Sequence, residues 1–206
     1  MLKRFVQIFR RRLRRLSDTQ NNSELVHAFP TALRKDAAIA IKALPENPYP
    51  WRTFTVLVGG ETVAIPRRIY HPTQLINTSH LNELQKELIN CLLTRHHDGF
   101  VRQRYLSQII NSNNVWIPPF VVQLLGEYVV EILDLLYNNL GNLNDTLYRE
   151  FLEANPEFLA VTAQRVASYW DCYYRSRWKK NEYVGFRMLQ FFHSLTKIRS
   201  AGRVGT

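Results

Sequence analysis

The chain has 206 residues, of which 46% are hydrophobic and 21% are charged. That composition is ordinary for a globular protein large enough to bury its own core, so folding requires neither a disulfide framework nor a structural metal. The formal net charge is +10, but residues 1–20 carry seven Lys or Arg and one Asp, whereas residues 115–157 carry one basic and seven acidic residues. Residues 158–206 are basic again, with nine basic and two acidic residues. This alternation excludes a uniformly basic nucleic-acid-binding surface.

The cysteine and histidine patterns indicate neither redox chemistry nor a metal centre. Cys91 and Cys172 lie within apolar helical patterns and form no CxxC pair. We therefore expect two buried free thiols in a reducing, cytoplasmic compartment. The six histidines lack the spacing of metal ligands on a helix. The sequence predicts no metal site, no cofactor and no transmembrane segment.

The first 20 residues have the pattern of a basic amphipathic helix. Leucine, valine and phenylalanine recur on one face, and arginines crowd the rest: Arg10, Arg11, Arg12, Arg14 and Arg15 are the candidate contact residues. Three interpretations fit this pattern. The helix docks on the rest of the protein, it lies on an anionic membrane surface or on nucleic acid, or it is an organellar transit peptide.

The next segments predict a helix followed by a β-hairpin. Residues 30–44 favour a helix between two prolines. Residues 53–65 form two β-rich runs around Gly59-Gly60, which predicts a hairpin with a two-residue turn of positive φ. In this register Val56 faces Val63 and Phe54 faces Ile65. The hairpin region extends to about residue 70 and includes two candidate phosphate contacts, Arg67 and Arg68.

Two further helices are expected between residues 79 and 110. Ser79 is the predicted N-cap of the first and Asp98 that of the second. The run DGFVRQRYL, which starts at Asp98, resembles the core signature of HEAT repeats. The resemblance covers about residues 80–154 and implies paired antiparallel helices. It implies that Asp98 caps the second helix, Val101 is buried and Arg102 pairs with an acidic residue of the neighbouring repeat. Tyr105 departs from the family pattern, which usually has a small residue there.

Residues 119–140 are apolar around nearly the whole helical circumference, which predicts one central buried helix. Its polar residues recur three or four positions apart on one stripe: Gln123, Glu127, Glu131, Asp134 and Asn138. Two interpretations remain open for the stripe. It faces solvent, or it is covered by a helix and pairs with arginines, among them Arg102 and Arg165, because a buried carboxylate without a partner is costly.

The segment after Asn155 combines aromatic and basic residues. Asn155-Pro156 predicts the start of a helix that continues to Lys180, and a last helix follows from Tyr183. Five aromatic residues lie among basic ones in this stretch: Tyr169, Trp170, Tyr173, Tyr174 and Trp178, with Arg175, Arg177, Lys179 and Lys180. The rings fill the core while the cations reach solvent, or the segment is a contact surface.

Taken together, these patterns predict an all-α fold. It is an antiparallel helical bundle or a short HEAT-like array with one inserted hairpin at about residues 53–70. The N-terminal helix of residues 1–20 precedes a single helical domain of residues 21–206.

The absence of a catalytic motif favours a non-enzymatic intracellular interaction or scaffold protein with a protein partner. The first alternative is RNA or single-strand binding through Arg67, Arg68 and the aromatic-basic segment, or contact of the basic ends with an anionic membrane. The second alternative is an enzyme with a site around Glu127, Glu131 and Asp134.

Overall fold

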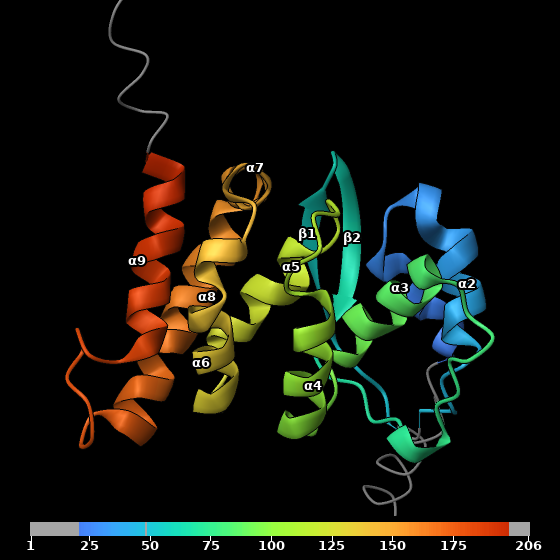
Figure 1. Cartoon of the computed structure of the whole chain (residues 1–206), viewed down its shortest axis with the longest axis horizontal. Helices are drawn as coiled ribbons and strands as arrows, with labels where there is room; N and C mark the ends of the chain where they lie inside the picture. The colour runs from blue at the N-terminus through green and yellow to red at the C-terminus, as the bar shows by residue number, and fades with distance from the viewer. Residues whose placement is uncertain (1–20, 48, 198–206) are drawn as a thin grey trace, which may run out of the picture.

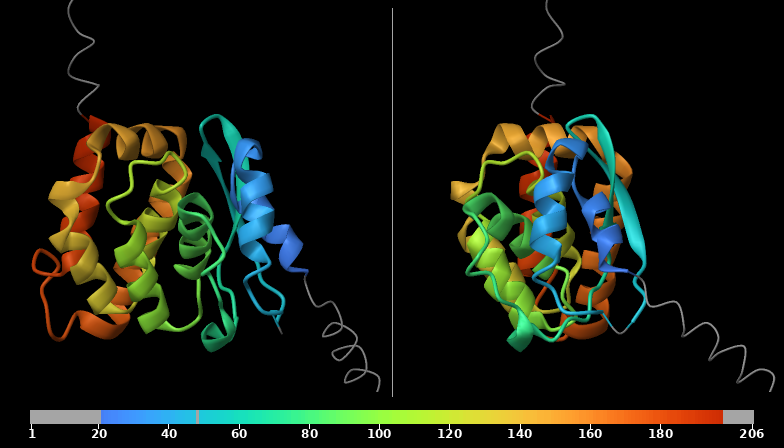
Figure 2. Two further views of the ribbon diagram at one scale, coloured as in Figure 1. Left: turned by 45° about the vertical axis from the view of Figure 1, so that its right-hand side comes forward. Right: turned by 90° about the vertical axis from the view of Figure 1, so that its right-hand side faces the viewer.

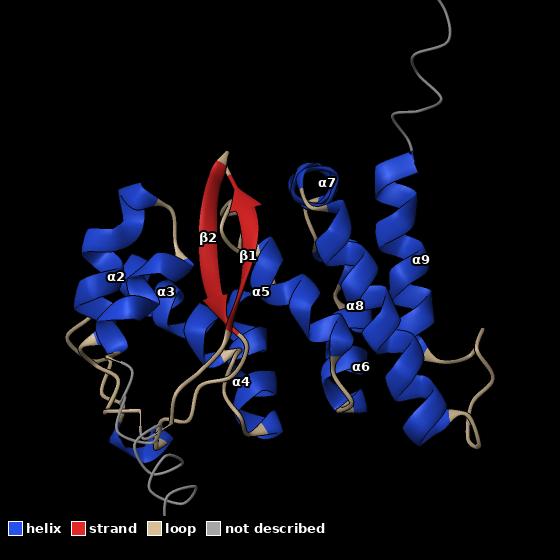
Figure 3. Ribbon diagram, turned by 180° about the vertical axis from the view of Figure 1, so that it is seen from behind, coloured by secondary structure: helices blue, strands red, loops and turns tan. Residues whose placement is uncertain are grey.

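A computed structural model describes residues 21–47 and 49–197. The predicted basic helix of residues 1–20, with Arg10, Arg11, Arg12, Arg14 and Arg15, lies outside the described residues. Within them the fold is mostly helical with one small antiparallel hairpin, as predicted (Figures 1 and 3). None of the helices in the described residues is long and apolar enough to cross a membrane.

The elements follow one another along the long axis of the molecule (Figure 1). A 3₁₀ helix η1 (Asn22–Ala28) and α2 (Arg34–Ile41) lie at one end of this axis, with α3 (Glu83–Leu93) beside α2, and α9 (Val184–Lys197) lies at the other end (Figures 1 and 2). The hairpin stands between the α2 and α3 end and the helices α7 (Asp145–Ala154) and α8 (Pro156–Tyr169), and α4 (Gly99–Ile109) lies near the middle of the axis (Figure 1). Buried apolar side chains from Leu25 to Leu195 form one continuous cluster.

The hairpin has the predicted register. Strands β1 (Thr53–Val58) and β2 (Glu61–Pro66) pair with Val56 opposite Val63 and Phe54 opposite Ile65. Gly59 and Gly60 have φ of +57° and +83°, which confirms the turn that the sequence predicted. All four of these paired apolar side chains are buried. The Phe54 ring stacks on Phe158 of α8 with a centroid distance of 5.4 Å, so the hairpin packs on the helices.

The single central helix predicted for residues 119–140 is wrong. The structure has a short helix α5 (Pro118–Val122), a 3₁₀ turn η4 (Gln123–Gly126) and a separate helix α6 (Val130–Asn138). Glu127 between them is extended, with φ −108° and ψ 153°. Gly126 precedes this break and packs against the side chain of Arg165. Because a break resets the helical phase, the polar stripe does not lie on one face.

The sequence predicted the N-cap residue of α4 correctly but not that of α3. Asp98 caps α4 by accepting a hydrogen bond from the Phe100 N–H, as expected. The cap of α3 is Asn82 rather than Ser79, because Asn82 and Gln85 form a reciprocal capping box. The first helix is shorter than residues 30–44: a 3₁₀ turn η2 (Thr31–Leu33) precedes α2.

The structure does not confirm a HEAT-like array. Arg102 pairs with Glu127 in the break between α5 and α6, and Val101 is half-buried rather than fully buried. In a regular repeat one helix would continue through Glu127, whereas here the chain is extended at this residue.

Asn155 is the N-cap residue of α8 and Pro156 its first residue, as predicted, but the Asn155 side chain has a different role. It makes no side-chain cap bond. Instead its side chain accepts from the Leu57 N–H (2.7 Å) and donates to the carbonyls of Leu57 (2.9 Å) and Phe151 (2.8 Å). This buried amide therefore ties strand β1 to the end of α7.

Replacing Asn155 by alanine is expected to lower the free energy of unfolding by about 1–3 kcal/mol, because it leaves buried polar groups without partners. The matched control is Asn138→Ala on α6, an exposed position where the change stays within about 0.5 kcal/mol. Urea unfolding of both variants measures the difference. Equal effects at the two positions would show that Asn155 does not hold the hairpin.

Candidate functional site

A buried charge cluster lies where the hairpin, α3, α4 and the break at Glu127 meet. Glu127 is 1% exposed. Both its carboxylate oxygens accept from Arg68 Nη2 at 2.7 Å, and Oε2 also accepts from Arg102 Nη2 at 3.1 Å. Arg95 Nη2 lies 3.8 Å from Oε1. The cluster thus places three guanidinium groups around one carboxylate.

Arg95 and Arg102 also donate to backbone carbonyls of two segments. Arg95 donates from Nε to Pro66 O (3.3 Å) and from Nη2 to Arg67 O (3.1 Å). Arg102 donates from Nη1 to the carbonyls of His96 (2.9 Å) and His97 (2.8 Å). The cluster therefore fixes the exit of β2, the α3–α4 turn and the break relative to one another.

Positive charge is in excess inside this cluster. Burial, and then the nearby Arg68, lowers the pKa of Arg95 to about 9, although Glu127 opposes the shift. Burial likewise lowers the pKa of Arg102, again against the effect of Glu127. Arg95 Nη1 and Arg102 Nε are buried and have no hydrogen-bond partner within residues 21–47 and 49–197. Because its carboxylate is fully occupied by guanidinium groups, Glu127 acts here as a structural counter-ion.

The three acidic residues of the predicted stripe do not converge. Glu131 and Asp134 are exposed, and among the described residues neither forms an ion pair. They line a hollow of about 390 Å³ between α6 and the segment before α9, together with Trp178 and Tyr183. Burial, and then Glu131, raises the pKa of Asp134. The solvent-facing and the arginine-paired interpretations therefore each describe part of the stripe.

The aromatic-basic segment does not continue as the predicted α-helix to Lys180. After α8 the chain forms a π-helix, η6 (Trp170–Tyr174), and then a turn. π-helical turns occur frequently at functional sites. Trp170 and Tyr174 are half-buried against the core, whereas Tyr173 is 62% exposed. The core interpretation therefore describes Trp170 and Tyr174, whereas Tyr173 is exposed and the contact interpretation stays a prediction.

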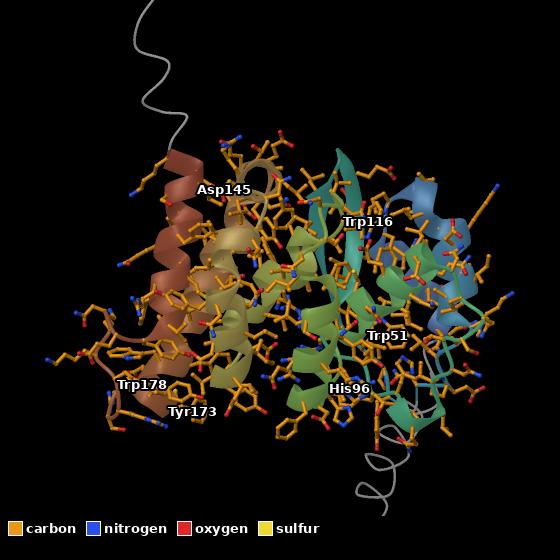
Figure 4. The ribbon with its side chains drawn as sticks, viewed as in Figure 1. Trp51, His96, Trp116, Asp145, Tyr173 and Trp178 are labelled. Carbon is orange, nitrogen blue, oxygen red and sulfur yellow. The ribbon has the colours of Figure 1, made fainter. Side chains whose placement is uncertain are left out.

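Three tyrosines gather at this π-helix, and we call them the tyrosine surface: Tyr128, Tyr169 and Tyr173. Their ring centroids are 6.0–6.1 Å apart in all three pairs. Tyr128, which follows the break at Glu127, is 49% exposed. The hydroxyl of Tyr174 donates to the carbonyl of Tyr128 and links the π-helix to the break. Figure 4 shows Tyr173 and Trp178 together at one edge of the molecule, with Asp145 at the opposite edge.

The predicted basic contact residues surround this surface but are partly engaged. Arg175 pairs with Asp171 at 3.0 Å, and the guanidinium of Arg177 lies 4.4 Å from the Trp178 ring centroid. Lys180 lies over the rings of Trp170 and Phe186. Lys179 is exposed.

The other predicted contact residues lie in different surroundings. Arg68 points to Glu127, as described above, whereas the adjacent Arg67 and the more distant Arg165 line a second hollow beside the hairpin. Arg165 forms no ion pair with Glu127 in the described part of the chain.

Two residues of the site were missed by sequence reasoning. Arg95 follows an apolar helix face, and nothing local signals that it is buried. Tyr128 lies inside the apolar run that predicted an unbroken helix. The one available signal was Gly126, which has low helix propensity within that run.

The cysteines are both free, but only Cys91 is buried. Cys172 lies in the π-helix and is exposed, contrary to expectation. No group of three or more histidine, cysteine or acidic side chains among the described residues is arranged to hold a metal ion.

Two buried histidines, His71 and His96, make the free energy of unfolding depend on pH. His71 Nδ1 donates to Pro45 O (2.8 Å), and His96 Nε2 donates to His71 O (2.8 Å). Burial lowers the pKa of His71 to about 4, and burial also lowers the pKa of His96. The second ring nitrogen of His71 is buried without a partner, so a proton there would place an unpaired charge in the core.

The unfolded chain binds protons at these histidines more readily than the folded chain, so stability falls as the pH drops from about 6.5 towards 4. For His71 alone we expect a loss of about 2 kcal/mol between pH 7 and pH 5. Urea unfolding at both pH values should show that His71→Asn, which keeps a donor towards Pro45, removes most of this loss. His193→Asn, on the exposed face of α9, is the control and should leave the loss unchanged. An undiminished loss in His71→Asn would contradict this assignment.

Comparison with known proteins found no matching family model, no matching curated protein and no matching solved structure.

Proposed function

We propose that this chain is a non-enzymatic interaction protein that binds a protein partner through the tyrosine surface. The observation that carries the proposal is the pairing of Tyr128 and Tyr173, which are 49% and 62% exposed although their rings lie next to each other. Large aromatic side chains exposed side by side are typical of protein contact sites, where tyrosine, tryptophan and arginine dominate the binding energy.

The geometry around these rings supports a pre-organised surface. Tyr169, in the last turn of α8, lies against both exposed rings. The Tyr174 hydrogen bond to the Tyr128 carbonyl keeps the π-helix and the break in contact. A tyrosine has few rotatable bonds, so a ring already held in place loses little conformational entropy when a partner covers it.

The charges around the tyrosines favour a protein over a nucleic acid. Four exposed basic residues are interspersed with acidic ones: Arg175, Arg177, Lys179 and Lys180 with Asp171, Glu131, Asp134 and Glu182. Phosphate-binding surfaces concentrate positive charge, whereas protein interfaces carry a mixed polar rim. RNA or single-strand binding is therefore the competing outcome of the test.

The test is site-directed photo-crosslinking in the cell of origin. A benzoylphenylalanine placed at Tyr173 is expected to cross-link to one specific protein. The control position is Leu75, in η3 (Thr73–Leu75), which is 65% exposed and lies towards the other end of the long axis (Figure 1). Cross-links from Tyr173 to RNA, or the same products from both positions, would overturn the proposal.

A further inference from the structure

A hollow of about 390 Å³ lies between strand β1 and helix α8, and no residue of the tyrosine surface lines it. Its walls come from the hairpin, from η4 and from α8: Thr53, Thr55, Arg67, Gln123, Phe158 and Arg165. This volume lies in the range of small-molecule sites. The proposed protein-binding surface does not use it.

The guanidinium groups of the two arginines in the hollow have no hydrogen-bonding partner among the described residues. No hydrogen bond or ion pair joins the guanidinium group of Arg67 or of Arg165 to another described residue, although Arg67 lies 5.7 Å from the centroid of the Phe54 ring. Glu157 also lines the hollow, but it forms no ion pair with either arginine. Both arginines are half-buried. Each guanidinium has five N–H donors in a planar fork that matches an oxyanion.

The two guanidinium groups are near enough to disfavour each other. Burial, and then the charge of Arg67, lowers the pKa of Arg165. The stem of Arg165 is fixed, because it packs against Gly126, where an added Cβ would lie 3.0 Å from Arg165 Cδ. Two like charges held together without a counter-ion are a cost that a bound anion removes.

The charge cluster behind the hollow adds to this field. There, three arginines surround the single carboxylate of Glu127, and Arg95 Nη1 has no partner. The electrostatic effect of Arg68 and Glu127 reaches Arg165. With Arg67 and Arg165 included, guanidinium groups outnumber carboxylates in this region. The potential in the hollow is therefore positive.

We propose that the hollow binds the phosphate group of a small phosphate monoester, held by Arg67 and Arg165. A phosphate monoester carries a charge of about −1.5 to −2 at neutral pH, and its three terminal oxygens can accept from both guanidinium groups at once. A carboxylate has one charge and two oxygens, so it compensates the two arginines less completely. The Phe158 side chain gives the hollow an apolar wall for the rest of the ligand.

The test is isothermal titration of the full-length protein with phenyl phosphate, with inorganic phosphate and benzoate as comparison probes. We expect saturable binding of phenyl phosphate, tighter than that of benzoate. Arg67→Gln and Arg165→Gln should each weaken it at least about tenfold, because each removes one charge-assisted contact. The charge-matched control is Arg104→Gln, on the exposed face of α4, which should bind like the wild type.

If Arg165→Gln does not fold, Arg67→Gln alone tests the proposal. This variant should fold, because the Arg67 guanidinium makes no hydrogen bond to a described residue. Binding of inorganic phosphate with the same dependence on both arginines would also support the phosphate site. The proposal is overturned if the wild type shows no saturable binding of phenyl phosphate. It is equally overturned if benzoate binds as tightly, or if Arg67→Gln binds as well as Arg104→Gln.

Discussion

Replacing Glu127 by glutamine is expected to lower the free energy of unfolding by about 3–5 kcal/mol, the usual result of breaking a buried ion pair by removing one partner. The carboxylate accepts from Arg68 and Arg102, and Arg95 lies nearby. A glutamine keeps the shape but cannot compensate three guanidinium groups. The variant therefore leaves buried positive charge without a counter-ion.

Urea unfolding at neutral pH measures this effect. The matched control is Glu131→Gln, four positions along the chain, where the carboxylate is exposed and unpaired among the described residues; its effect should stay within about 0.5 kcal/mol. The double variant Glu127→Gln with Arg68→Gln should recover part of the loss, because it removes one of the uncompensated charges. A loss below about 1 kcal/mol in Glu127→Gln would show that the cluster is not held by its carboxylate.

The hairpin could be predicted from the sequence because its signal is local. Gly59 and Gly60 supply the positive φ that the turn requires, and counting outwards from them fixes the register. Asp98 was predictable for the same reason, since an N-cap bond joins residues only two positions apart. Asn82 took the place of Ser79 because its reciprocal bond with Gln85 satisfies two backbone groups.

The break at Glu127 could not be predicted because its cause is not local. Glu127 continues the helical polar stripe, and the residues on both sides are apolar. The partners that draw it out of the helix are 59 and 25 positions away, at Arg68 and Arg102. Helix propensity and periodicity cannot detect such a pairing, and tertiary contacts override them here.

The candidate contact residues show the same limit. Arg67 and Arg68 are neighbours with the same side chain, yet one lines an open hollow and the other binds Glu127. Likewise, periodicity on a regular helix cannot separate Tyr173, which is exposed, from Tyr174, which is half-buried. The π-helix sets that difference, because it changes the number of residues per turn.

Removing the two exposed rings of the tyrosine surface is expected to weaken partner binding strongly. Truncation of one hot-spot aromatic residue typically costs at least about 2 kcal/mol, which is about 30-fold in affinity, and such costs are not additive. Tyr128→Ala with Tyr173→Ala should therefore lower the affinity by roughly 30-fold or more. The fold should tolerate the change, because both rings are exposed and the bond from Tyr174 uses the backbone carbonyl of Tyr128. The Tyr128 side chain also interacts with Arg102, a contact whose loss costs about 1 kcal/mol.

The most direct measurement is the equilibrium Kd between this protein and the purified protein that cross-links at Tyr173, for the wild type, for Tyr128→Ala with Tyr173→Ala, and for the control Leu75→Ala. We predict a Kd raised by roughly 30-fold or more in the tyrosine variant and unchanged in the control, with the free energy of unfolding within about 1 kcal/mol of the wild type in both. An equal Kd for the folded tyrosine variant and the wild type would contradict the proposed interaction surface.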